Sequence, residues 1–159
     1  MNPAVARPDA AHAVKCELAG EVLRSSGKLR LRVTGWSMLP AVWPGDTLLI
    51  ERADAATVSP GDIVLFGRDR RLFAHRVTGR SDLAGQAGIL TRGDALPYHD
   101  PPVPGRDLLG KISSIVRNGK LIQPRKSPHF TARAVAALVR RSEIAARVVV
   151  GVHGMRQTS

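Results

Sequence analysis

Hydrophobic and polar residues alternate in short stretches over most of the chain, and this pattern predicts β-strands. In residues 28–33, three apolar side chains (Leu29, Leu31 and Val33) alternate with basic ones, as in a strand with one buried face. Two Pro-Gly-Asp triplets, at 44–46 and 60–62, predict turns that lead into strands, and Asn118-Gly119 predicts a hairpin turn. The further predicted strands are 47–51, 63–67, 72–78, 89–92, 109–117 and 120–123.

Helical periodicity marks the two ends of the chain. Residues 1–11 are rich in alanine and proline and predict a loose segment, whereas residues 12–24 predict a helix. Residues 131–150 predict a second, basic amphipathic helix. The apolar face of the first helix comprises Val14, Leu18, Ala19, Val22 and Leu23.

These elements predict a mainly β fold, a compact and folded-over antiparallel β domain with one helix before it and one after it. We expect three regions: an N-terminal tail and helix at 1–27, a β domain at 28–123 and a basic helical extension at 124–159.

Positive charge is concentrated at the end of the chain. Residues 1–116 hold 15 Lys/Arg against 12 Asp/Glu, whereas residues 117–159 hold 9 against 1. The helix at 131–150 is therefore a candidate for peripheral contact with an anionic membrane, and it could equally cover the β domain, mediate dimerisation or remain a solvated surface. Aromatic residues make up only 4% of the chain and no nucleic-acid-reading module is evident, so we expect no specific nucleic-acid partner. The pattern indicates no particular oligomeric state.

Several classes of protein are disfavoured by the composition. No apolar stretch approaches the roughly 18 residues that cross a bilayer, and the N-terminus lacks a signal-peptide core. We therefore expect a soluble, cytoplasmic protein without a transmembrane segment. The single cysteine, Cys16, cannot form an internal disulfide, and the histidines show no paired ligand spacing, so we expect no metal and no cofactor.

One serine and one histidine form a candidate catalytic pair. Ser37 follows a predicted strand in the string Gly-Trp-Ser-Met-Leu-Pro, and His75 lies in an alternating strand with Phe73 and Val77 on its face. A serine hydroxyl is a weak nucleophile until a base such as neutral imidazole removes its proton. Each residue alone also fits an ordinary structural role, as a turn serine or a core histidine.

Two aspartates are candidates to orient the histidine. Asp94, at the end of Thr-Arg-Gly-Asp, and Asp100 follow the strand at 89–92, and either could accept the imidazole Nδ1–H. Both also fit turn or loop roles beside Gly93 and Pro101. The pattern does not choose between them.

The ordered set of these strings resembles type I signal peptidases. The strings are Gly-Trp-Ser-Met-Leu-Pro, Pro-Gly-Asp, Gly-Asp-Ile-Val-Leu-Phe, His-Arg-Val, Thr-Arg-Gly-Asp and Leu-Leu-Gly-Lys-Ile. Their order and spacing agree with the family over residues 29–122. The chain is most similar to the Ser-His branch found in endoplasmic reticulum and archaeal enzymes, in a superfamily shared with SOS-response repressor autopeptidases. That resemblance implies Ser37 as nucleophile, His75 as general base, and Asp94 or Asp100 as orienting acid. The chain departs from the family in lacking a transmembrane anchor before the serine.

The resemblance also implies a substrate and the residues that bind it. We expect a soluble serine endopeptidase that removes a leader or signal segment from a polypeptide, which would lie extended beside strands near the nucleophile. The Ser37 backbone N–H, aided by Thr34, would supply the oxyanion hole. A peptide-binding or partner-docking module without turnover is the alternative. The expected substrate contacts are Thr34, Gly35, Trp36, Met38, Leu39 and Pro40.

Overall fold

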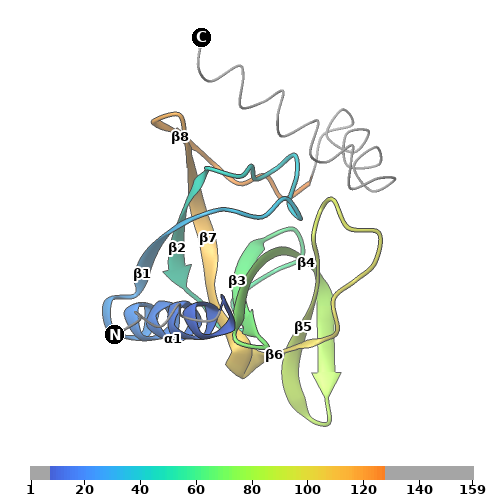
Figure 1. Cartoon of the computed structure of the whole chain (residues 1–159). Helices are drawn as coiled ribbons and strands as arrows, with labels where there is room; N and C mark the ends of the chain where they lie inside the picture. Colours follow the sequence, from blue (N-terminus) through green and yellow to red (C-terminus); the bar gives the residue numbers. More distant parts are fainter. Residues whose placement is uncertain (1–7, 128–159) are drawn as a thin grey trace, which may run out of the picture.

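Eight strands, every pair antiparallel, form one sheet in the part of the chain that the computed structural model describes, residues 8–127 (Figure 1). The strand order is β1-β2-β7-β3-β4-β5-β6, and β8 pairs with β7. The mainly β fold with an N-terminal helix is therefore confirmed, whereas the predicted helix at 131–150 and most of the region 124–159 lie outside the described residues. The strands are β1 (Lys28–Arg32), β2 (Thr47–Arg52), β3 (Ile63–Arg68), β4 (Arg71–Leu83), β5 (Gln86–Arg92), β6 (Val103–Pro104), β7 (Leu108–Arg117) and β8 (Lys120–Ile122).

Helix α1 (Pro8–Ser26) begins four residues before the predicted start at His12, so the expectation of a loose segment is wrong for residues 8–11. Proline is well accommodated in the first turn of a helix, and the alanines that follow favour the helical state. The helix ends at Gly27, whose φ of 72° lies in the left-handed region. α1 contacts β1, β4, β7 and β2 (Figure 1).

Only part of the predicted apolar face of α1 is buried. Ala19 and Leu23 pack inward, but Val14, Leu18 and Val22 remain exposed. The predicted helical period is correct, yet the sheet covers a narrower stripe of the helix than the apolar residues occupy.

Alternate residues of β3 face two separate cores. Ile63 and Leu65 belong to a cluster with Leu48, Ile50, Ile112 and Ile115, whereas Val64 and Phe66 belong to a second cluster with Val77, Ile89 and Val103. Both faces of this strand are therefore covered, as expected for a sheet that folds over on itself. Each fully buried aliphatic side chain contributes roughly 1.5–3 kcal/mol to this packing.

The two Pro-Gly-Asp triplets form the turns expected of them. Gly45 and Gly61 both have a φ of 94°, and each turn leads directly into a strand, β2 or β3. In each, the aspartate side chain accepts a hydrogen bond from a backbone N–H three residues earlier: Asp46 from Trp43 at 2.8 Å and Asp62 from Ser59 at 2.9 Å.

The strands differ from the prediction mainly at three places. β4 continues to Leu83 instead of ending near residue 78, because its outer half (Gly79–Asp82) is mostly polar and gives no apolar signal. β5, its partner, begins at Gln86 instead of Ile89. β6 and the short 3-10 helix η1 (Gly105–Asp107) follow Pro101-Pro102 and were not predicted. None of these differences changes the segments that carry the candidate site.

Candidate active site

Ser37 lies in a tight turn that follows β1. The chain beyond β1 is tied to the first Pro-Gly-Asp turn, where the Val33 N–H donates to Asp46 O (2.8 Å) and the Gly45 N–H donates to Val33 O (2.9 Å). The turn closes with a hydrogen bond from the Leu39 N–H to Trp36 O at 3.1 Å. Met38 is buried in the core, so the turn is anchored while Ser37 stays partly exposed.

His75 comes from the middle of β4 and is held rigidly. It pairs with Val64 of β3, its exposed fraction is 2%, and the rings of Phe66 and Phe73 lie with centroids 5.9 Å from its own. Its Nε2 atom lies 3.0 Å from Ser37 Oγ, within hydrogen-bond distance. The two residues therefore meet in space, although 38 positions separate them in the sequence.

Asp100 lies on the other side of the imidazole. Its Oδ2 atom is 2.7 Å from His75 Nδ1 and accepts a second hydrogen bond, also 2.7 Å long, from the Thr91 hydroxyl. The Asp100 N–H donates to Thr91 O at 2.9 Å, which fixes the loop at this point.

Charge and hydrogen bonding keep Asp100 ionised. Burial alone would raise the pKa of Asp100, but the hydrogen bonds from His75 and Thr91, together with electrostatic attraction to His75 and Arg68, outweigh burial and lower the pKa. An ionised carboxylate can only accept, so Nδ1 is the nitrogen that carries the proton in the neutral form of His75. In that form the Nε2 lone pair faces the Ser37 hydroxyl, which is the arrangement that a general base requires.

Asp94 has a different position from Asp100. Its two carboxylate oxygens face Arg76, with Arg76 Nε to Oδ1 at 2.8 Å and Nη2 to Oδ2 at 2.7 Å, and both side chains are buried. Arg76 Nη1 also donates to the carbonyls of Gly61 and Arg125. Of the two candidate aspartates, the one that accepts from His75 is therefore Asp100, while Asp94 holds the start of the loop that carries Asp100.

A cleft of about 530 Å³ opens beside Ser37. One side is formed by residues 31–38 and the other by residues 71–74 of β4. Of the expected substrate contacts, Thr34, Gly35, Trp36 and Met38 line this cleft.

The other two expected contacts, Leu39 and Pro40, do not line the cleft, so the prediction is wrong for them. The Leu39 side chain is fully buried, and Pro40 lines a separate pocket with Ile115 and Ile122. The reason is the turn itself, because it reverses the chain after Ser37, directs the Leu39 side chain inward and leads Pro40 away from the cleft.

Of the two glycines near Ser37, Gly93 and not Gly35 makes a close contact with the turn. A Cβ atom at Gly35 would meet nothing within 4 Å, so no described neighbour requires glycine there. A Cβ atom at Gly93 would lie 2.6 Å from Ser37 O, and the Ala95 N–H donates to the same oxygen at 2.9 Å. The close approach of Gly93 therefore positions the Ser37 backbone.

Three residues that support the site were not assigned roles from the sequence. Thr91 and Gly93 stand in the string Thr-Arg-Gly-Asp, where a hydroxyl next to a strand end was the available signal. Arg68 donates to the carbonyls of Pro101 (2.6 Å) and Pro102 (3.2 Å), just beyond Asp100, and gave no local signal because its partners are 33 and 34 positions away.

Neither a metal centre nor a membrane-spanning helix is present in the described residues, 8–127. No group of three or more His, Cys, Asp or Glu side chains is arranged to hold a metal ion in this part of the chain. None of the helices in the same residues has the length and apolar character needed to cross a membrane.

Comparisons with known proteins add no family assignment. No model of a known protein family matches the chain, and no curated protein is significantly similar to it. The function must therefore be inferred from the geometry of Ser37, His75 and Asp100.

Proposed function

We propose that the protein is a serine endopeptidase, similar to signal peptidases of the Ser-His type, that removes a leader or signal segment from a polypeptide. The observation that carries the proposal is the continuous hydrogen-bonded line from Ser37 Oγ through the two imidazole nitrogens of His75 to Asp100 Oδ2, with distances of 3.0 and 2.7 Å. Three side chains from separate parts of the chain meet in the order that acyl transfer by serine needs.

In this mechanism Ser37 Oγ attacks the scissile carbonyl while His75 Nε2 takes its proton. The imidazolium that forms is stabilised by Asp100 and then gives the proton to the leaving amine, which leaves an acyl group on Ser37. Water, deprotonated by the same nitrogen, releases the acyl group and restores the serine. The Ser37 backbone N–H, aided by Thr34, would stabilise the negative oxygen of each tetrahedral intermediate.

The strands beside Ser37 suit an extended polypeptide. β1 pairs only with β2 among the described strands, and β5 pairs with β4 only from Arg76 onward. The free edges of residues 31–34 and 72–74 therefore border the cleft, and a peptide between them can bond through its main chain. The apolar lining, with Leu72, Ala74 and Val33 among its members, favours small or aliphatic substrate side chains.

A peptide-binding module without turnover is the second candidate, because the same free edges would serve binding alone. The two differ in one property: only the peptidase requires that the Ser37 hydroxyl react. Peptide binding that persists in the Ser37→Ala variant, with no cleavage by the wild type, would favour the module.

The test is cleavage of polypeptides that carry N-terminal leader or signal segments, followed by mass spectrometry of the products. We expect the wild type to cut at one position and the Ser37→Ala and His75→Ala variants to be inactive. Equal products from all three proteins, or no product from a broad set of substrates with the wild type, would refute the proposal.

A further inference from the structure

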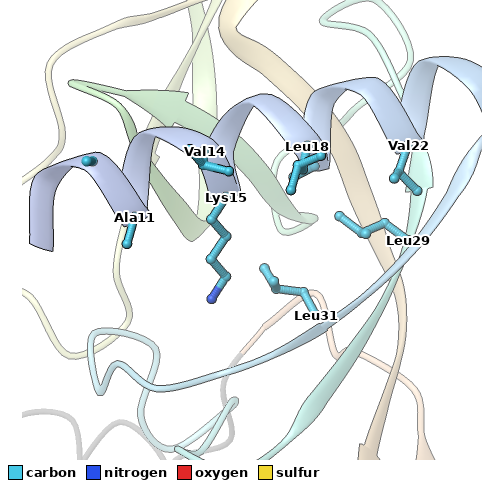
Figure 2. A pocket seen from close by; sticks show the side chains of 9 residues that line it. Ala11, Val14, Lys15, Leu18, Val22, Leu29 and Leu31 are labelled. Carbon is cyan, nitrogen blue, oxygen red and sulfur yellow. The ribbon is translucent and has the colours of Figure 1, made fainter. Parts of the chain in front are cut away.

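An apolar groove of about 500 Å³ runs between α1 and β1, on the side of the molecule that carries the exposed face of the helix (Figure 2). Leu29 and Leu31 of β1 lie opposite Val14, Leu18 and Val22 of α1 (Figure 2). These three helix residues are exposed in the described part of the chain, although they stand at helical spacing like buried positions. A concave surface of this size is large enough to bind a ligand.

The groove and the cleft beside Ser37 adjoin each other. Lys15 and Leu31 line both of them. Lys15 extends from α1 toward β1 (Figure 2), and its side chain belongs to the lining of both spaces. A chain that leaves the cleft along residues 31–36 therefore enters the groove.

Positively charged side chains line the cleft on this side. They are Lys15 of α1 and Arg32 of β1, and none of the described residues in the lining is acidic. A cleft with walls of one sign attracts a ligand of the opposite sign.

We propose that the α1–β1 groove binds a short aliphatic stretch of the polypeptide substrate, with an acidic side chain of that substrate placed at Lys15. This inference rests on the proposed function, since it takes the cleft to be where the polypeptide is cut. The position of the groove next to the cleft favours a polypeptide over a lipid surface, because an extended chain can occupy both spaces whereas a bilayer would cover only the groove.

The dimensions set the length of the stretch and its distance from the cut. From Ala11 to Val22, α1 extends about 16 Å at roughly 1.5 Å per residue, the length of about five extended residues. Leu31 precedes Ser37 by six positions, a span of at most about 20 Å, so a spacer of about six extended residues reaches from groove to serine.

The test is binding of a fluorescent peptide to full-length Ser37→Ala protein, measured by fluorescence anisotropy. The peptide has about five leucine and alanine residues, one glutamate and a spacer of about six residues, and it is made in both chain directions. Replacing Val14 and Leu18 together by glutamine should weaken binding about tenfold, because two aliphatic side chains lose their contact. Leu121→Gln on β8 is the matched control, because Leu121 is 62% exposed and Leu18 is 59% exposed.

The charge is tested in the same assay. Lys15→Glu should weaken binding about fivefold for the peptide with glutamate but not for one with glutamine in its place, and Lys15→Arg should retain it. Lys120→Glu, an exposed change on β8, should have no effect.

Equal affinity for the Val14/Leu18 double variant and Leu121→Gln would overturn the inference. The inference would also be overturned if neither peptide bound. If the Val14/Leu18 double change then abolished flotation with liposomes, the occupant would be a membrane, and if it abolished dimerisation, the occupant would be a second copy of the chain. The proposed function is tested separately, because the anisotropy measurement does not require a reactive serine. It fails if a fluorophosphonate does not label Ser37 in the wild type.

Discussion

The two aspartates of the candidate site should respond to the same substitution in opposite ways. Asp100→Asn removes the charge that faces His75 Nδ1, whereas Asp94→Asn removes the charge that faces Arg76. Each change is nearly isosteric, so the difference between the two variants reports the partner of each carboxylate.

The partners of the two carboxylates indicate how much activity or stability each substitution should remove. Asp100→Asn withdraws a charge-assisted hydrogen bond of about 1.5–3 kcal/mol from the imidazolium. The new amide can also donate to Nδ1, which moves the ring proton to Nε2 and removes the base, so we expect Ser37 reactivity to fall by at least about 10³-fold. Asp94→Asn leaves the buried Arg76 charge poorly compensated, which costs about 3–5 kcal/mol of stability and lowers Tm by about 10 °C.

The assay is the rate at which a fluorophosphonate modifies Ser37, per folded molecule, together with thermal unfolding followed by circular dichroism. Asp100→Asn should react slowly and lose less stability than Asp94→Asn, whereas Asp94→Asn should be the less stable variant but should react within about tenfold of the wild-type rate. The assignment of the two carboxylates is refuted if Asp94→Asn loses reactivity as severely as Asp100→Asn while remaining folded. It is refuted equally if Asp100→Asn reacts at the wild-type rate.

Three further predictions concern the surroundings of the site. The pKa values of Asp62 and Asp100 are lowered in the fold, so ionisation of these carboxyl groups stabilises the folded state. This stability is present above the unfolded pKa of about 3.9 and is lost as the pH falls through the lower folded pKa values. Urea titrations between pH 6 and pH 2 should show the loss of stability, and the loss should be smaller in Asp62→Asn. Thr91→Val removes one of the two hydrogen bonds to Asp100 Oδ2 and should slow Ser37 labelling by about tenfold, with no change if the hydroxyl has no positioning role. Gly93→Ala places a Cβ atom 2.6 Å from Ser37 O and should slow labelling. Gly79→Ala is the control, because its Cβ atom would make only an ordinary contact, 3.6 Å from Leu90 Cδ1, and equal labelling of the two variants would contradict the close approach.

Short-range patterns predicted most of the fold. The alternation in residues 28–33 and the Pro-Gly-Asp turns correspond to β1 and to the turns before β2 and β3. The hairpin at Asn118-Gly119 also formed, with φ values of 51° and 74°. Two comparable turns, Asp69-Arg70 and Ala84-Gly85, have positive φ at both residues, but their sequences are weaker hairpin signals.

The features that the sequence could not predict depend on contacts between residues that are far apart in the chain. The choice between Asp94 and Asp100 depends on Arg76, which binds Asp94 although 18 positions separate the two residues. Asp100 is the carboxylate that accepts a hydrogen bond from His75. The burial of Leu39 depends on the turn that Ser37 occupies, and periodicity does not describe turns. The exposure of Val14, Leu18 and Val22 on α1 could not be predicted either, because helical spacing does not show how much of the apolar face the sheet covers.

The central claim is that His75 activates the hydroxyl of Ser37. The most direct measurement is the site and rate of covalent modification by a fluorophosphonate, with the adduct located by tandem mass spectrometry in the wild type, Ser37→Ala and His75→Ala. We predict one adduct, on Ser37, that is absent from Ser37→Ala and forms at least about 10³-fold more slowly in His75→Ala. No adduct on Ser37, or equal rates in the wild type and His75→Ala, would contradict the claim.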